Sequence, residues 1–253
     1  MGVKRLFWDI ETSPNIVLSW NCGYKLTIQP QNIVQERAII CICYKWEGDK
    51  KVHSLEWDRG DDKGLLKRFS KIAEESDEMV AHNGDWFDLK WFNARCLVHG
   101  IPPVPSIKTV DTLKIAKRHF YFNSNRLDYI AKLLFGNGNG KTKTDYEMWK
   151  KITLENDPKA LKKMVKYCKN DVVILERVWQ KLRDYEVPAT HAAVNATGDF
   201  KDRWMCAHCG SSHVRKSKTM VTAKGMVKHQ MKCNDCGRYY SIANNVFKWY
   251  LEA

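Results

Sequence analysis

Hydrophobic residues are grouped into short runs between polar turns along the first third of the chain. Residues 3–12 (VKRLFWDIET) and 37–46 (RAIICICYKW) are apolar runs that predict buried strands, whereas the alternation in 51–57 (KVHSLEW) predicts a third, more exposed strand. Apolar residues then recur at helical spacing over 63–75, which predicts an amphipathic helix.

Strands and helices alternate through the middle of the chain. The pattern predicts strands at 79–82 and 107–110, and helices at 86–98, 113–120, 127–134 and 159–185. Three early strands followed by this alternation predict an α/β fold with a mixed β-sheet flanked by helices. The pattern alone does not distinguish between the α/β sheets that share this order of elements.

Composition changes near residue 188. The stretch 188–199 (PATHAAVNATGD) holds small and polar residues without periodicity, as linkers do. We therefore expect a larger domain over 1–187, a linker over 188–200 and a small domain over 201–253. The small domain holds ten Lys or Arg against three Asp or Glu, so it contributes +7 of the formal charge of +13. This surplus favours a polyanionic partner such as nucleic acid, with a merely soluble basic protein as the alternative.

The chain has no apolar run long enough for a signal peptide or a membrane span. A cytoplasmic protein is therefore expected, in a host cytoplasm if the source is a virus. Nine cysteines in a reducing compartment argue against a disulfide framework. Five scattered cysteines are interpreted as small core residues: Cys22, Cys41, Cys43, Cys96 and Cys168. The glycine-rich stretch 136–144 (GNGNGKTKT) is interpreted as a basic loop touching a phosphate backbone or, equally, as a solvated linker.

Two carboxylates lie two residues apart in the first predicted strand, at Asp9 and Glu11. Alternate strand residues point to one face, so these acids should lie side by side and repel each other. A divalent cation with a preference for oxygen ligands, Mg²⁺ or Mn²⁺, relieves that repulsion. An exposed pair at the end of a strand is the alternative.

Two further acids begin or interrupt helices. Asp88 follows a glycine turn in His82–Asp88 (HNGDWFD), where an acid can also cap the helix. Tyr167 and Asp171 are four residues apart in the long predicted helix and share one face. Asp171 precedes an apolar run (VVIL) and therefore needs a partner, with a buried salt bridge or an exposed stripe as alternatives. Asp111 is interpreted as a helix N-cap.

The three motifs together resemble those of the DEDD exonucleases: Asp9-x-Glu11, HNGxxFD ending at Asp88, and Tyr167-x-x-x-Asp171. A tyrosine four residues before the last acid is similar to the DEDDy branch, since the histidine of the other branch would stand at Lys166. The resemblance covers about residues 3–185 and extends to stand-alone exonucleases and the proofreading domains of family B DNA polymerases.

This resemblance implies a ribonuclease-H-like fold and a 3′–5′ exonuclease that releases nucleoside 5′-monophosphates, preferentially from single-stranded DNA. Two Mg²⁺ or Mn²⁺ ions would be held by four acids: Asp9, Glu11, Asp88 and Asp171. Tyr167 would orient the attacking water. Thr12 and Asn83 would contact the terminal nucleotide, Trp86 would stack on a base, and Phe87 is better explained by core packing.

Two CxxCG motifs stand near the C-terminus, at Cys206/Cys209 and Cys233/Cys236. Two thiolate pairs suit a tetrahedral Zn²⁺, and this arrangement resembles a zinc ribbon with a closed, structural site. A redox CxxC is the alternative, but it does not need two copies. Three histidines are not needed as ligands once four cysteines bind: His208, His213 and His229.

Basic residues of the predicted ribbon are interleaved with Trp204, Tyr239 and Tyr240, which suits contact with phosphates and unstacked bases. A docking surface for a replication or repair protein is the competing interpretation. For the whole chain, the alternatives are an RNA 3′-end exonuclease, a structure-selective nuclease, or a nucleic-acid-binding adaptor without activity. The presence of all four acids argues against the adaptor.

Overall fold

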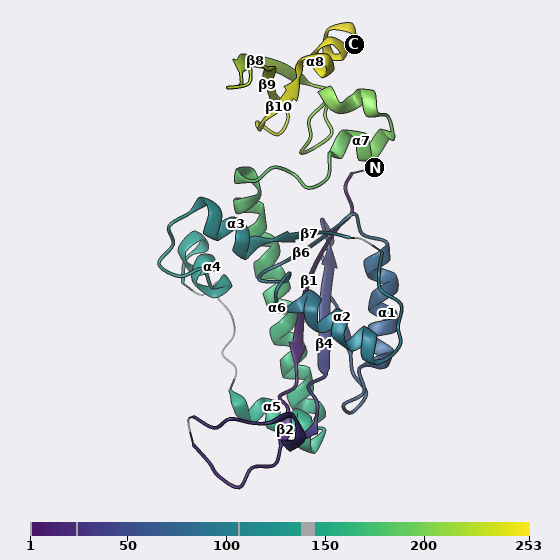
Figure 1. Ribbon diagram of the computed structural model, residues 1–253, viewed down its shortest axis with the longest axis vertical. Helices are drawn as coiled ribbons and strands as arrows, with labels where there is room; N and C mark the ends of the chain where they lie inside the picture. The colour runs from purple at the N-terminus through teal and green to yellow at the C-terminus, as the bar shows by residue number, and fades with distance from the viewer. Residues whose placement is uncertain (1, 24, 106, 138–144) are drawn as a thin grey trace.

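A mixed five-stranded sheet forms the centre of the larger part of the molecule (Figure 1). The computed structural model describes residues 2–23, 25–105, 107–137 and 145–253. The strand order is β5-β4-β1-β6-β7. Their bounds are Arg5–Thr12 (β1), Ile39–Trp46 (β4), His53–Glu56 (β5), Glu78–Ala81 (β6) and Lys108–Asp111 (β7). β4 runs antiparallel to β1 and β5, whereas β6 and β7 run parallel to β1 and β6 respectively, so the predicted mixed sheet is confirmed.

Helices cover both faces of this sheet, and neighbouring residues of β1 show which helix covers which face. The Phe7 ring lies edge-on to Trp179 of α6 (Pro158–Leu182), 5.2 Å between centroids. The adjacent Trp8 contacts Phe69 of α1 (Lys63–Glu74) and Phe92 of α2 (Asp88–Val98). Because successive strand residues point to opposite faces, α6 covers one face and α1 with α2 covers the other.

Three shorter helices pack against α6: α3 (Thr112–His119), α4 (Leu127–Phe135) and α5 (Tyr146–Glu155). The first two confirm the pattern-based prediction, while α5 has no counterpart in it. A 3₁₀ turn over Arg183–Tyr185 follows α6, so the long helix ends at Leu182 rather than at 185. Most of the glycine-rich stretch 136–144 lies outside the described residues.

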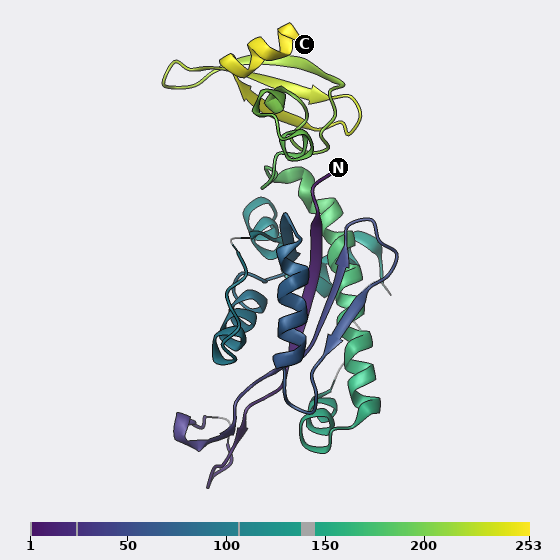
Figure 2. The ribbon, with the colours of Figure 1, turned by 90° about the vertical axis from the view of Figure 1, so that its right-hand side faces the viewer.

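A long arm leaves the sheet between β1 and β4 (Figures 1 and 2). Its two short strands, β2 (Ile16–Val17) and β3 (Ile33–Gln35), pair with each other, and a 3₁₀ turn (Pro30–Asn32) precedes β3. Trp20 is fully exposed on this arm. Cys22 is also exposed, so its interpretation as a core residue was wrong: it lies on this arm and belongs to neither hydrophobic cluster of the described residues. The other four scattered cysteines are buried.

The C-terminal residues form a second, smaller hydrophobic cluster. A three-stranded antiparallel sheet of order β10-β9-β8 packs beside α8 (Asn244–Glu252). Its strands are Val214–Val221 (β8), Val227–Cys233 (β9) and Tyr239–Ala243 (β10).

A short helix, α7 (Ala192–Thr197), lies in the stretch interpreted as a linker, and a 3₁₀ turn over Phe200–Trp204 follows it. The His191 side chain accepts a hydrogen bond from the Val194 N–H at the start of α7, and Gly198 ends it in a left-handed conformation. These capping residues explain a helix that hydrophobic periodicity did not predict. Among the described residues, none of the helices combines the length and the apolar character that crossing a bilayer requires.

Candidate metal centres

Three carboxylates from two elements meet where β1 faces α6. Asp9 and Glu11 share the face of Phe7, which α6 covers, and Asp171 lies on α6 itself. One carboxylate oxygen from each of the three lies within 4.8 Å of the others. Asp171 is buried, whereas Asp9 and Glu11 are half-buried. The fold thus brings Asp171 next to Glu11, although they lie 160 positions apart in the chain.

Asp88, at the start of α2, contacts the same strand from the side on which β6 pairs with it. The parallel pairing of β1 with β6 ends at Phe7 and Val80, so the next part of β1 has an open edge on that side. The buried Asp88 carboxylate fills this edge, where its Oδ1 accepts a hydrogen bond from the Ile10 N–H at 3.1 Å. Asp88 therefore stands beside the strand segment that carries Asp9 and Glu11.

A tight turn between β6 and α2 brings Asp88 to that position. Asn83 adopts a left-handed backbone conformation (φ 67°), and its N–H donates to Asp111 Oδ1 at 2.9 Å. A Cβ atom at Gly84 would lie 2.3 Å from the Cβ of Ala81, so only glycine fits there without displacement. Asp111 also accepts from the Leu113 N–H, which confirms its prediction as the N-cap of α3.

The electrostatics of this cluster favour a cation. Burial raises the pKa of the Asp9 carboxyl well above its ordinary value, and acidic neighbours raise it further: Cys168, Asp88, Asp171 and Glu11. Convergent carboxylate oxygens are the donor set that hard divalent ions such as Mg²⁺ or Mn²⁺ prefer. The residues present therefore fit such ions, with the carboxylates of Asp9, Glu11 and Asp171 nearest one another.

Buried thiols line the side of this cluster. The sulfur atoms of Cys41, Cys43 and Cys168 lie within 4.8 Å of one another. Cys168 Sγ lies 3.4 Å from the Asp9 carbonyl oxygen and 3.5 Å from Asp9 Oδ2. Burial also raises the pKa of the Cys168 thiol well above its ordinary value. These small side chains hold β1, β4 and α6 close together, as expected for core cysteines.

The other predicted site residues lie around the acids. Tyr167 is half-buried on α6, on the helix face of Asp171 and one turn before it. Thr12 ends β1 directly after Glu11, and Asn83 lies in the turn before Asp88. Trp86 is 71% exposed, with the Lys90 ammonium 3.4 Å from its ring centroid.

A groove of about 420 Å³ opens beside Glu11 and contains residues that pattern reasoning missed. Arg37 lines it, and its buried Nε has no hydrogen-bond partner among the described residues. Trp149 of α5 donates from Nε1 to the Thr12 carbonyl oxygen at 3.1 Å. Phe87 lines the groove and also packs against the main core, in agreement with the preferred interpretation. Asp145, which caps α5 by accepting from the Met148 N–H, is the signal that could have predicted this helix.

The four C-terminal cysteines also converge. One sulfur from each lies within 4.8 Å of the others: Cys206, Cys209, Cys233 and Cys236. The Sγ atoms are 3.6 Å apart for Cys206 and Cys236 and 3.7 Å apart for Cys209 and Cys233. A tetrahedral zinc with Zn–S bonds of about 2.3 Å has sulfur edges of about 3.8 Å, so the cluster could form a zinc ribbon.

Residues near the cysteine cluster have structural partners. His213 contacts Asp235 at 3.0 Å, and His229 stacks on Phe247 with ring centroids 3.9 Å apart. Tyr240 donates to the Trp204 carbonyl oxygen at 2.6 Å, so this aromatic is part of the small core. Tyr239 is exposed, with the Lys232 ammonium 5.5 Å above its ring.

Comparisons with known proteins place the chain in a class. A model of the RNase H superfamily matches residues 34–183, more than half of the chain, and the protein therefore belongs to this superfamily. The strand that carries Asp9 and Glu11 precedes the matched region.

Among solved structures, the family B DNA polymerase from the hyperthermophilic archaeon Pyrobaculum calidifontis is similar to the chain, with a TM-score of 0.55 and 18% identity. The match covers 72% of this chain and 25% of the polymerase, so the chain spans about a quarter of the polymerase's length. This similarity confirms the ribonuclease-H-like fold and its likeness to a family B polymerase. No curated protein sequence matches the chain.

Proposed function

We propose that this protein is a two-metal-ion 3′–5′ exonuclease that acts on DNA, preferentially single-stranded, and releases nucleoside 5′-monophosphates. The observation that carries the proposal is the convergence of the Asp9, Glu11 and Asp171 carboxylates, with the Asp88 carboxylate hydrogen-bonded to the backbone of β1 beside them. We also propose that the exonuclease occupies residues 1–187, that the ribbon occupies 201–253, and that the protein works in the cytoplasm.

The chain's own residues suit phosphodiester hydrolysis. Asp9, Glu11, Asp88 and Asp171 would hold two Mg²⁺ or Mn²⁺ ions, which when bound supply positive charge to the attacking and leaving oxygens. Tyr167, one turn from Asp171, would orient the attacking water through its hydroxyl group. A positioning role suits a phenol, whose ordinary pKa of about 10 makes it a weak base at neutral pH.

The groove beside Glu11 suits the 3′ end of a single strand. Arg37 brings a buried guanidinium N–H that needs an acceptor, and a phosphate oxygen is a fitting one. Thr12 lines the same groove, and Asn83 and Trp86 lie in the turn that carries Asp88. An unstacked base can pack on the exposed Tyr146 ring of this groove.

Asp9→Asn and Asp171→Asn test this proposal. Each change keeps the side-chain shape but removes a charge that a cation needs, so cleavage should fall by orders of magnitude. The assay uses 5′-labelled and 3′-labelled DNA and RNA strands with Mg²⁺, Mn²⁺ or neither. A 3′–5′ enzyme shortens the 5′-labelled strand stepwise and releases the 3′ label at once as a mononucleotide.

Glu74→Gln, on the exposed side of α1, is the matched control and should cleave at the parental rate. Tyr167→Phe should slow cleavage by less than the carboxylate changes. Parental activity in either Asn variant, with circular dichroism unchanged, contradicts the assignment. Faster cleavage of the RNA strand than of the DNA strand would identify the substrate as the 3′ ends of RNA.

For the ribbon, we propose one structural Zn²⁺ bound by Cys206, Cys209, Cys233 and Cys236. The sulfur separations near the edge length of a zinc tetrahedron support this. Metal analysis should find one zinc per chain, falling to none in Cys206→Ser. The exposed cations of β8 and β9 would then contact nucleic acid, with docking of a replication or repair protein as the alternative.

A further inference from the structure

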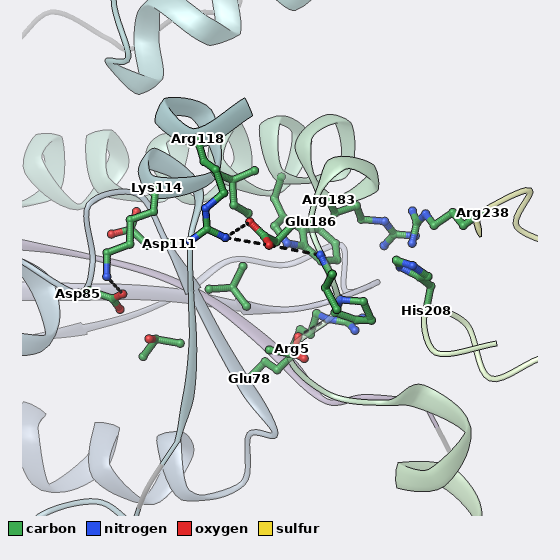
Figure 3. A pocket seen from close by; sticks show the side chains of 17 residues that line it. Arg5, Glu78, Asp85, Asp111, Lys114, Arg118, Arg183, Glu186, His208 and Arg238 are labelled. Atoms are coloured by element: carbon green, nitrogen blue, oxygen red, sulfur yellow. Dashed lines mark hydrogen bonds and ion pairs between the residues drawn. The ribbon is translucent and has the colours of Figure 1, made fainter. Parts of the chain in front are cut away.

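A cavity of about 290 Å³ lies away from the acids, between the sheet and the ribbon (Figure 3). Its walls come from β7, the start of α3, the end of α6, the segment 186–189 and both CxxCG turns of the ribbon. None of the four clustered acids lines it. Pockets between folded units are common sites for small ligands.

Part of the cavity wall is apolar. Val110, Ile115 and Val187 line it together with Pro188 and Ala189. Trp179 adds an indole ring held by two guanidinium groups, with Arg5 at 5.2 Å and Arg183 at 4.7 Å from its centroid. A flat apolar group can therefore be buried there against rigid side chains.

Two arginines gather at the ribbon side of the cavity, where Figure 3 shows Arg183 and Arg238 beside His208. Burial and the nearby Arg238 lower the pKa of His208 to about 4, so this imidazole is neutral at pH 7. Arg238 pairs with the half-exposed Asp184, yet its buried Nε has no hydrogen-bond partner among the described residues. Burial lowers the pKa of the Arg183 guanidinium, and the nearby Arg238 lowers it further. Arg183 already donates to Glu47 at 3.1 Å, so the Arg238 Nε is the donor that an incoming anion would satisfy, with Arg183 adding positive charge beside it.

Carboxylates also line the cavity. Glu186 accepts from Arg118 at 2.9 and 3.0 Å, and Asp85 accepts from Lys114 at 2.6 Å. These two cations are about two-thirds exposed, so the ion pairs are weak and can rearrange. A ligand with hydroxyl or amino donors would find acceptors in these carboxylates.

We propose that this cavity binds a nucleoside 5′-monophosphate. Its phosphate would contact Arg183 and Arg238, its base would pack against the apolar wall, and the polar groups of the base or sugar would meet Glu186 or Asp85. The cavity extends to Asp111, which holds the turn before Asp88 through the Asn83 N–H. The inference goes beyond the proposed nuclease activity and does not depend on it.

Calorimetric titration of the full-length, zinc-loaded protein with dAMP, without added Mg²⁺ or Mn²⁺, tests the proposal. We expect saturable binding to one site, with dAMP bound more tightly than either inorganic phosphate or deoxyadenosine. Arg238→Ala and Arg183→Gln should each weaken dAMP binding about tenfold or more, since each removes a charge-assisted contact. Asp171→Asn should bind dAMP as the parent does, while losing any nuclease activity.

Two controls separate binding from folding. Asp184→Asn breaks the ion pair of Arg238 but keeps the guanidinium, so dAMP binding should persist. Arg68→Ala removes an exposed arginine of α1 that does not line the cavity, and it should leave dAMP binding unchanged. The proposal is overturned by absence of binding at millimolar dAMP, by equal binding of deoxyadenosine, by loss of binding in Asp171→Asn, or by parental binding in both arginine variants. It is equally overturned if Asp184→Asn loses as much affinity as Arg238→Ala.

Discussion

At the scale of single residues, strand parity predicted one part of the candidate site. Asp9 and Glu11 had to share a face of β1, and the structure places them together with Asp171. Arg37 could not be predicted, because its importance comes from a buried Nε beside a groove rather than from a motif. Asp88 had two interpretations, capping and catalysis, and its contact with the Ile10 N–H shows that it reaches beyond its own helix.

Gly84→Ala should distort the turn between β6 and α2 and thereby displace Asp88. The new Cβ would meet Ala81 at 2.3 Å, and Asp88 Oδ2 lies only 3.8 Å from it. Crowding of this kind typically costs about 1–3 kcal/mol and moves the backbone, so we expect lower stability together with a large loss of nuclease activity.

Gly64→Ala is the matched control, since a Cβ there meets nothing within 4 Å. It should keep activity and leave stability unchanged or slightly higher. Equal activity of the two variants would contradict the importance of the turn.

Asp62→Asn should lower the free energy of unfolding, because Asp62 holds together elements on the sheet face opposite α6. The fully buried Asp62 accepts from the Ile39 N–H, from Arg95 at 2.7 and 2.8 Å and from His99 at 2.6 Å. Removing its charge leaves Arg95 poorly paired, and such losses cost about 3–5 kcal/mol. Urea unfolding at pH 7 measures the change, with Asp128→Asn in an exposed pair as the control expected to lose under about 1 kcal/mol.

The same carboxylate predicts a pH dependence. Burial raises the pKa of Asp62, but hydrogen bonds from Arg95, Ile39 and His99 outweigh this, and the pKa lies below its ordinary value. The folded state therefore binds this proton more weakly than the unfolded state. Its contribution is present above the ordinary carboxyl pKa of about 4 and is lost as pH falls through the folded value. The stability gap between the parent and Asp62→Asn should narrow at low pH, and a constant gap would argue against an ionised Asp62.

At the scale of elements, long periodic segments were predicted well and short ones were not. α1 and α6 appear as expected because each has an extended apolar stripe. α5 and α7 were missed, since both are short and are defined by the caps Asp145 and His191 rather than by periodicity. The stretch interpreted as a linker therefore contains more regular structure than its composition indicates.

Trp149→Phe should show what α5 contributes. The change keeps an aromatic ring but removes the Nε1 donor to the Thr12 carbonyl oxygen at 3.1 Å. A buried hydrogen bond of this kind contributes about 1 kcal/mol, so the stability loss should be modest. Because Thr12 follows Glu11 in the groove, the KM for single-stranded DNA should rise more than kcat falls. Trp249→Phe in α8 is the control. Equal effects of the two changes on KM and kcat would contradict a role for α5 in substrate binding.

At the scale of the whole molecule, charge predicted a polyanionic partner but not where that partner binds. The exposed cations of β8 stand on an edge strand, where lysines also prevent strands of other molecules from pairing. The surplus of lysine and arginine on β8 is therefore explained either by protection of the strand edge or by contact with a polyanionic partner. The cavity between the sheet and the ribbon could not be predicted from the sequence, because its residues come from segments spread over the chain.

Replacing Arg215, Lys218 and Lys228 together by serine separates these explanations. If the three contact single-stranded DNA, affinity should fall and the slope of log affinity against log salt should decrease by about 0.7 for each lost phosphate contact. Fluorescence anisotropy between low and moderate salt measures that slope. A matched triple change of exposed lysines away from the ribbon, at Lys51, Lys67 and Lys71, should leave it unchanged. An identical slope in the ribbon variant would favour the protein-docking interpretation.

The position of Arg238, two residues after Cys236, has a consequence for the whole chain. The turn that closes the cysteine cluster also delivers a guanidinium to the distant cavity beside Asp184. Reciprocity of coupled equilibria then requires that whatever strengthens one occupancy strengthens the other by the same factor. Bound nucleotide should raise the affinity for zinc, measured by competition with a chelator, and zinc depletion should weaken nucleotide binding by the same factor.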